Sequence, residues 1–114
     1  MPHRGYKFLE DIRAAIQRVR EFIKGRSQSE YEVNEFLQSA VERQLEIIGE
    51  ALNRARREDE TLMDHISDGH RIIGLRNLLI HGYDIIDHSV VWAIVSNKLD
   101  LLDREIHALM DEYW

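Results

Sequence analysis

The spacing of apolar side chains is the feature that most constrains how this chain of 114 residues can fold. Between residues 6 and 24 apolar residues recur at steps of three and four, and the pattern repeats between residues 29 and 57. An α-helix has about 3.6 residues per turn, so each stretch presents one apolar face. No stretch alternates apolar and polar residues over the length of a strand. We therefore predict an all-α fold in which these apolar faces pack together.

Turn and capping residues predict where the helices begin and end. Gly25 suits the left-handed position after a first helix, and Ser29-Glu30-Tyr31-Glu32 has the Ser-x-x-Glu form of a capping box at the start of a second. Val33 and Phe36 are expected on the buried face of that second helix.

The later elements are a short helical turn at 61–66 capped near Asp59, a helix from about His70 to Gly82, and a last long helix that starts at Asp87 or Ser89.

The length and the short connections define the overall organisation. Domains commonly have about 100–150 residues, so we expect one helical domain over residues 1–114. Short links between long helices make consecutive helices antiparallel neighbours. The sequence thus predicts an antiparallel bundle of four to five helices.

Composition restricts the chemistry and the cellular environment. The chain has no cysteine, which excludes disulfides and thiolate metal sites and fits a reducing compartment. It has no apolar run near the roughly 20 residues that cross a bilayer, and its first residues lack the apolar core of a signal peptide. We expect a cytoplasmic protein that has no membrane partner.

Charge is distributed unevenly along the chain. The formal net charge is −6, which argues against a general nucleic-acid coat protein. Residues 1–26 nevertheless carry seven Lys or Arg and three acidic residues, whereas the remainder carries eight and eighteen. The first helix can therefore dock an RNA backbone or an acidic partner, or it can be a solvated face.

One polar segment interrupts the apolar helical pattern, and it contains Arg76, Asn77, His81 and Tyr83. A guanidinium binds phosphate oxygens through paired donors, and an imidazole ordinarily titrates near neutral pH. These groups suit RNA cleavage without a metal, in which His81 transfers a proton and Arg76 neutralises charge on the phosphate. Tyr83 can bind a phosphate or stack on a base.

Helical geometry limits how this segment can act. Each residue advances about 100° around a helix, so His81 lies about 140° round from Arg76 on a continuous helix. One straight helix cannot direct both side chains at one phosphate. Either the helix frays before Gly82, or two facing subunits each supply one of the groups. Asn77 and His81 are four residues apart, so they share a face and can hydrogen-bond.

A polar seam runs along the second helix. Arg43, Glu46 and Glu50 lie at steps of three and four, and Gly49 within the helix can mark a close approach of another helix. The seam is either an ordinary surface ion pair or part of the active cleft. In the second case Arg43 and Glu46 orient the Arg76 segment.

These residues also carry a resemblance to a known family. The motif Arg76-x4-His81-x-Tyr83 within residues 72–83 resembles the signature of HepT-like HEPN proteins, as do residues 45–51 and Val91-Trp92. The family often has a proline and a tryptophan just before the Ile-Ile-Gly segment, where this chain has Ser67-Asp68-Gly69-His70. We expect that difference to alter local packing more than the chemistry.

The resemblance implies a function for the motif. It implies a homodimeric toxin that cleaves RNA (with transfer RNA as one candidate substrate), needs no cofactor, and pairs with an MntA-type nucleotidyltransferase antitoxin. In that family the residues matching Arg76 and His81 are catalytic, and the residue matching Asn77 supports the site. The residue matching Tyr83 is the tyrosine that the antitoxin modifies with AMP.

Other functions remain open at this point. The histidines do not show the i, i+4 spacing of a helical zinc site, so we predict no metal site. A dimeric module that binds RNA or a nucleotide beside a nucleotidyltransferase, without cleaving anything, fits the same residues. A plain helical adaptor with the motif buried as packing is the third alternative.

Overall fold

The helix α3 (Glu35–Glu58) is the centre of the structure, because it packs against α1 on one side and α4 on the other. The computed structural model describes residues 5–113, without the side chains of Tyr83 and Tyr113. Over these residues the chain has no strand, which confirms the all-α prediction. The remaining elements are α1 (Tyr6–Ile23), α2 (Gln28–Val33), η1 (Glu60–His65), α4 (Gly69–His81), η2 (Tyr83–Ile85), α5 (His88–Asn97) and α6 (Leu99–Tyr113).

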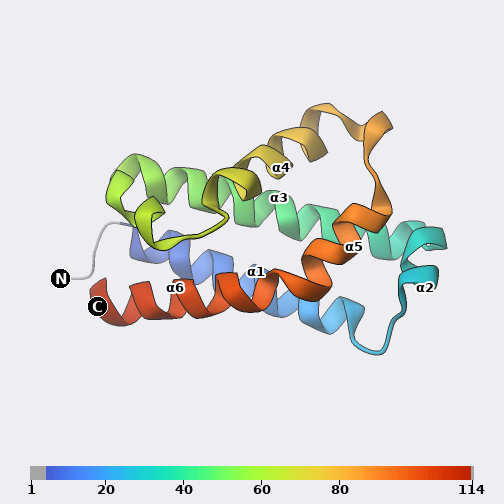
Figure 1. The fold of residues 1–114 in the computed structure, drawn as a ribbon, viewed down its shortest axis with the longest axis horizontal. Coiled ribbons are helices and arrows are strands. Elements are labelled where there is room, and N and C mark those ends of the chain that lie inside the picture. The colour runs from blue at the N-terminus through green and yellow to red at the C-terminus, as the bar shows by residue number, and fades with distance from the viewer. Residues whose placement is uncertain (1–4, 114) are drawn as a thin grey trace.

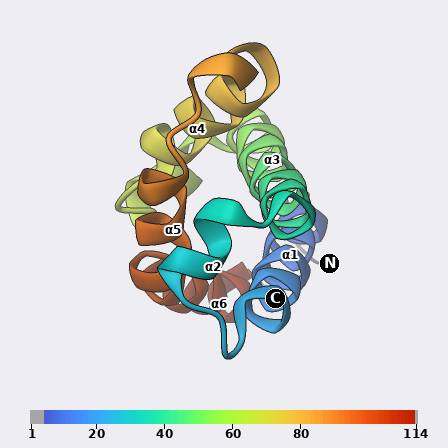
Figure 2. The same ribbon diagram turned by 90° about the vertical axis from the view of Figure 1, so that its right-hand side faces the viewer.

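Figure 1 shows α1 and α6 along one long side of the molecule, with α3 and α4 along the other. The chain runs one way along α1 and returns along α3, so these two helices are antiparallel as predicted. Figure 2 shows the long helices around a common interior, with α2 lying across one end. The C-terminal end of α4 and the η2 turn project at a corner of the bundle (Figure 1).

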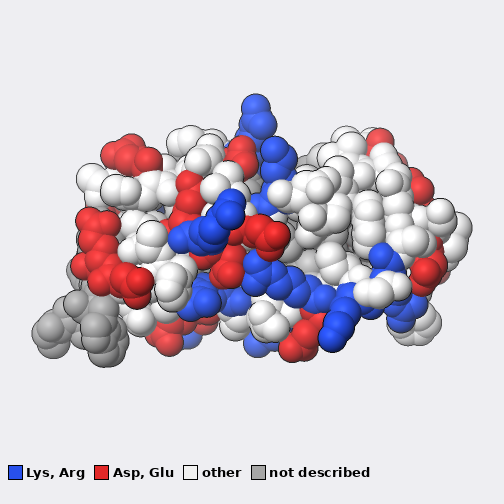
Figure 3. Space-filling model, turned by 60° about the horizontal axis from the view of Figure 1, so that its bottom comes forward, with Lys and Arg blue, Asp and Glu red and all other residues white. Residues whose placement is uncertain are grey.

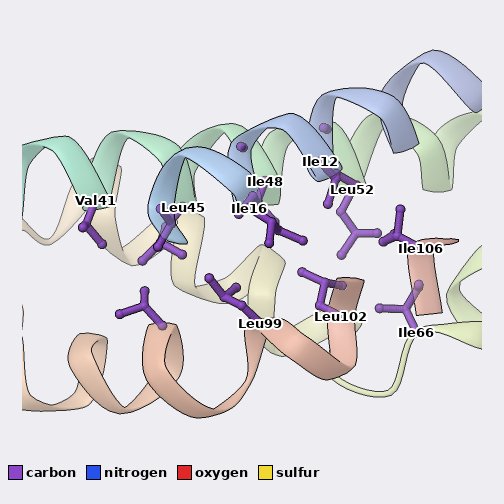
Figure 4. Packing of buried hydrophobic residues seen from close by; sticks show 14 of the residues in the cluster. Ile12, Ile16, Val41, Leu45, Ile48, Leu52, Ile66, Leu99, Leu102 and Ile106 are labelled. Carbon is purple, nitrogen blue, oxygen red and sulfur yellow. The ribbon is translucent and has the colours of Figure 1, made fainter. Parts of the chain in front are cut away.

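The interior is filled by the apolar faces that the sequence pattern predicted. Ile12 and Ile16 of α1 and Leu45 and Ile48 of α3 point into one interior, opposite Leu99 and Leu102 of α6 (Figure 4). These side chains are at most 4% exposed, and burying each stabilises the fold by roughly 1.5–3 kcal/mol. Burial of these faces against one another fixes which side of α3 remains available for other contacts.

Most predicted helix boundaries agree with the structure. Gly25 has φ of 73° directly after the end of α1, as expected of a left-handed capping residue. Asp59 caps η1 through Thr61, Asp87 caps α5 through Ser89, and Gly82 ends α4. Local side-chain chemistry decides these positions.

The predicted start of the second helix was wrong. The capping residue is Ser27, whose hydroxyl accepts from the backbone N–H of Glu30, and the helix begins at Gln28. The expected single helix is also divided at Asn34, which has an extended backbone and caps α3 by accepting from the N–H of Leu37. An asparagine side chain competes for backbone hydrogen bonds in this way.

The break at Asn34 overturns two predicted core positions. Phe36 is 92% exposed and Val33 is 83% exposed, although both were expected on the buried face. The buried aromatic residue of this segment is Tyr31, which stacks at an angle against Trp92 of α5 with ring centroids 5.5 Å apart. The change of direction between α2 and α3 therefore exchanges which side chains face inward.

The last predicted helix is likewise two helices, α5 and α6, which meet at Lys98. The backbone N–H of Lys98 still donates to the carbonyl of Ile94, so the chain bends there without forming a loop. Buried residues continue on both sides of the bend, at Val95 and Leu99. Among the described residues, no helix has the length and apolarity needed to cross a membrane.

The basic charge of the first helix is largely paired within the molecule. Arg20 binds Asp100 and Asp103 of α6 at 2.7 and 2.9 Å, and Arg13 also binds Asp103. Lys7 pairs with Asp11 within the helix. Figure 3 shows positive and negative side chains interleaved on the face that α1 and α6 share. These contacts favour a structural role for much of this charge over the alternative of an RNA dock.

Candidate functional site

Helix α4 approaches α3 closely at Gly49. A Cβ atom on Gly49 would lie 2.3 Å from the Cβ of Arg76 and 3.1 Å from the carbonyl oxygen of Ile72. Carbon atoms normally keep about 3.5–4.0 Å apart, so only glycine permits this packing. The prediction that Gly49 marks a close helix approach is therefore confirmed. The contact determines where along the axis of α3 the side chain of Arg76 lies.

The guanidinium of Arg76 is held from two sides. Its Nη2 atom lies 2.9 Å from Oε2 of Glu50 on α3, and its Nη1 atom donates to Oδ1 of Asn77 at 2.8 Å. The Nε atom is buried and has no hydrogen-bond partner within the described part of the chain. Arg76 is 26% exposed, so its charged end reaches solvent from a fixed position.

Arg76 lies in a groove of about 210 Å³ between α1, α3 and α4. The groove combines three arginines, three carboxylates and several apolar side chains. Its lining residues are Phe8, Asp11, Arg43, Glu46, Ile47, Glu50, Ala51, Arg54, Arg76 and Ile80. Of the predicted site residues, the structure brings Arg43, Glu46 and Arg76 together here.

Glu50 forms ion pairs with two of the three arginines that line this groove. Its Oε1 atom accepts from Nε of Arg54 at 3.0 Å, while its other oxygen binds Arg76. The hydrogen bond from Arg54 lowers the pKa of the Glu50 carboxyl below its ordinary value, and the charges of Arg76 and Arg54 add to this effect. Partial burial opposes the shift without reversing it. Glu50 is therefore ionised at neutral pH and shared by two cations.

His81 does not line the groove. It is the last residue of α4 and is exposed. The backbone N–H of Gly82 donates to the carbonyl of Leu78 at 2.7 Å, so α4 stays helical through His81 and does not fray before Gly82. Arg76 and His81 therefore diverge around one helix as the straight-helix geometry requires.

The remaining predicted residues have different outcomes. Asn77 contacts Arg76, and no hydrogen bond between Asn77 and His81 occurs among the described contacts. The backbone of Tyr83 begins η2 directly after the cap of α4, and its side chain lies outside the described part of the structure. Sequence reasoning placed Glu50 on the polar seam but missed its contact with Arg76. Its position beside Gly49 was the available signal.

Two other places in the molecule are lined by side chains of interest. An apolar cavity of similar volume lies on the other side of α4, between Ile48, Leu75 and Leu102. A cluster of the buried Tyr31 with the partly buried Glu42 and His88 joins α2, α3 and α5. Neither place offers a fixed cation toward solvent as the groove does. Within the described residues, no three His, Asp or Glu side chains are grouped so that they could hold a metal ion.

The start of α4 lies in the segment where the sequence departs from the family pattern. Gly69 is buried, and a Cβ atom there would lie 2.5 Å from the terminal methyl of Met63. Ser67 is tied to Glu105 of α6 by its backbone N–H and its hydroxyl, the latter at 2.7 Å. These contacts anchor the start of the helix that carries Arg76.

Fold and groove together define a class: an all-α protein with a motif arginine fixed by a carboxylate at the contact of two helices. Comparison with known families assigns the class more closely, because the model of the family described as "Ribonuclease HepT-like" matches residues 12–109. The chain belongs to the HepT-like ribonuclease family.

Individual relatives agree with this assignment. "Putative RNase MJ1380" of Methanocaldococcus jannaschii is 34% identical over 99 residues, which cover 87% of this chain and 90% of the relative. "Probable ribonuclease HepT" of Thermococcus cleftensis is 32% identical over 102 residues, which cover 90% of this chain and 92% of the relative.

A third relative is longer than this chain. "Gamma-glutamylcyclotransferase and putative RNase MJ0434" of M. jannaschii is 30% identical over 105 residues, and the match spans 92% of this chain but about half, 47%, of that protein. Comparison with solved structures found no significant match.

Proposed function

We propose that this chain is a metal-independent endoribonuclease and the toxin of a toxin–antitoxin pair, with Arg76 and His81 as its catalytic residues. The observation that carries the proposal is the guanidinium of Arg76, which Glu50 holds in an open groove. Membership of the HepT-like ribonuclease family supports the activity. The exposure of His81 argues against the alternative of an adaptor whose motif is buried as packing.

The proposed reaction is a phosphoryl transfer within RNA. His81 removes the proton of a ribose 2′-hydroxyl, or protonates the leaving 5′-oxygen, and a water molecule takes the complementary role. The 2′-oxygen bonds to phosphorus while the bond to the 5′-oxygen breaks, which leaves a cyclic phosphate and a free 5′-hydroxyl. Arg76 stabilises the negative charge that develops on the phosphate.

A two-fold dimer supplies the geometry that one α4 helix lacks. Because α4 is helical through His81, the histidine that serves one Arg76 comes from the facing copy. Exposed apolar side chains next to His81 support a contact surface there, since Leu78 is 39% exposed and Ile85 is 69% exposed.

The test of activity uses purified protein, total RNA and EDTA. We expect cleavage by the wild type, a loss of roughly 10²–10³-fold in Arg76→Ala, and a loss of roughly 10²–10⁴-fold in His81→Ala. His70→Ala is the matched control, because His70 is also exposed on α4. Intact RNA with the wild type would refute the nuclease. Binding of the RNA or of a nucleotide without cleavage would then favour the non-catalytic partner of a nucleotidyltransferase.

Mixing inactive variants tests the shared site. In a dimer of one Arg76→Ala copy with one His81→Ala copy, one intact arginine faces one intact histidine across the interface. Activity should therefore return on mixing, to about a quarter of the wild-type value if each dimer has two clefts. No recovery after proven subunit exchange would show that both residues act within one copy.

We also propose that an MntA-type nucleotidyltransferase silences the toxin by adding AMP to Tyr83. The tyrosine follows His81 by two residues, at the exposed corner where α4 ends. An added phosphodiester would place negative charge near the cleft and repel RNA. Tyr83→Phe should keep cleavage but escape silencing. Silencing of this variant to the wild-type extent would place the switch elsewhere.

A further inference from the structure

The carboxylate of Glu50 connects two arginines that come from different helices. Its Oε2 atom binds Nη2 of Arg76 on α4 at 2.9 Å, and its Oε1 atom accepts from Nε of Arg54 on α3 at 3.0 Å. Arg54 uses Nε for this bond, which leaves its two terminal nitrogens for another acceptor. These three groups together carry a net charge of about +1, and the other charged residues that line the groove, Arg43, Asp11 and Glu46, bring its total to about zero.

Three contacts restrict the position of Arg76 before any ligand arrives. Glu50 and Asn77 each bind one terminal nitrogen of Arg76. Because Gly49 has no side chain, the Cβ and Cγ atoms of Arg76 pack directly against α3. A free arginine loses rotamer entropy when it is immobilised. In this groove much of that loss is already incurred on folding, so a ligand meets a cation that is already oriented.

We propose that Glu50 is a positioning residue, which holds the guanidinium groups of Arg76 and Arg54 side by side so that one RNA phosphodiester contacts both. The identification of RNA as the ligand rests on the proposed function. Arg54 is then a phosphate-binding residue of the groove. Glu50 acts through the two arginines and does not touch the RNA.

This role predicts a separation of binding from catalysis. Removing a carboxylate from a groove that binds a polyanion strengthens attraction, so charge alone predicts tighter RNA binding and faster cleavage for Glu50→Gln. Positioning predicts the opposite effect on the chemical step, because misplacement of a catalytic group by about 1 Å can cost about 10²-fold. The sign of the change in cleavage rate therefore distinguishes the two explanations.

The experiment measures affinity and rate separately. A labelled oligonucleotide with 2′-O-methyl groups at every position, which lacks the attacking hydroxyl, reports affinity; single-turnover cleavage of saturating RNA reports the rate. For Glu50→Gln we expect affinity equal to or tighter than the wild type and a rate at least roughly 10-fold lower. For Arg54→Ala we expect weaker affinity and a salt dependence reduced by about one phosphate contact.

Glu30→Gln is the matched control for Glu50→Gln. Glu30 forms a comparable exposed i, i+4 ion pair with Arg26, at 3.6 Å, and lies on α2 away from the groove. It should change neither affinity nor rate. The double variant of Glu50→Gln with Arg54→Ala should show non-additive effects, because the two side chains share one contact.

A second readout keeps the positioning role testable even if no RNA is cleaved. In ¹⁵N spectra of the wild type, the guanidinium signals of a held Arg76 should show slow rotation of its terminal nitrogens, and Glu50→Gln should remove this signature. Absence of cleavage together with a held Arg76 would refute the nuclease but not the positioning role. Wild-type cleavage by Glu50→Gln, or an Arg76 that rotates freely in the wild type, would overturn the positioning role itself.

Discussion

Replacing Gly49 with alanine tests the packing on which the site depends. The added Cβ would lie 2.3 Å from the Cβ and 3.0 Å from the Cγ of Arg76. Restoring an ordinary contact of about 3.5 Å requires the two helices to separate by about 1.2 Å at this point. The nearest atom is the first carbon of the side chain, so Arg76 cannot relieve the overlap by changing rotamer.

The energetic effect has two parts of opposite sign. Overpacking typically costs about 1–3 kcal/mol, whereas alanine in place of a helical glycine gains up to about 1 kcal/mol. We therefore expect Gly49→Ala to be destabilised by about 1–2 kcal/mol. For a chain of this size that corresponds to a fall in Tm of about 4–8 °C. The displacement of Arg76 should also lower RNA cleavage.

The matched control is Gly74→Ala. Gly74 lies within α4, and a Cβ atom there would meet nothing within 4 Å. This variant gains helix propensity without the steric overlap. We therefore expect its free energy of unfolding to increase by about 0.5–1 kcal/mol and its Tm to rise. Thermal unfolding followed by circular dichroism measures both variants. A Gly49→Ala protein as stable and as active as the wild type would refute the argument that α4 is seated on this glycine.

Three further predictions address the fold and its electrostatics. Phe36→Ser should change stability by less than about 0.5 kcal/mol, whereas Ile48→Ala should cost about 2–5 kcal/mol, and equal effects in urea unfolding would contradict the observed burial. Burial raises the pKa of the Glu42 carboxyl, so the folded protein binds the proton of this carboxyl more tightly than the unfolded chain does. Above the folded-state pKa the carboxyl is ionised, and its burial then lowers the free energy of unfolding. Glu42→Gln should therefore raise Tm at pH 8, and the gain should shrink on acidification toward pH 4; a gain that persists there would exclude this cause. Asp103→Asn, which removes the ion pairs of Asp103 with Arg13 and Arg20 but leaves that of Arg20 with Asp100, should cost up to about 1 kcal/mol at low salt and less in 1 M NaCl, as compared by melting curves at the two salt concentrations.

The structure contributes most where residues far apart in sequence meet. Glu50 and Arg76 are 26 residues apart and belong to different helices, so no local pattern pairs them. The sequence placed Glu50 on a polar seam and Gly49 at a close approach, and these two observations almost define the contact. What was lacking was the identity of the helix that approaches.

The exposed phenylalanine shows the converse limit. Phe36 fits the apolar periodicity of one continuous helix, and the prediction failed because the chain turns at Asn34. Asn34 and Ser27 are both ordinary capping residues, and the sequence offered Ser29 as an equally good alternative. The relation of about 100° per residue holds only within one continuous helix, so the break at Asn34 prevents one apolar face from continuing across it.

The sequence by itself determined the all-α class, the ends of most helices, the family, and the motif that contains Arg76, His81 and Tyr83. These features depend on local propensity, on a period of about 3.6 residues and on capping side chains, all of which act within a few residues. Only the tertiary structure decided that α4 sits on Gly49, that Glu50 joins Arg76 to Arg54, and that the charge of α1 is paired with α6. Periodicity defines which face of a helix is apolar, but the neighbour of each face follows from how all the helices pack together.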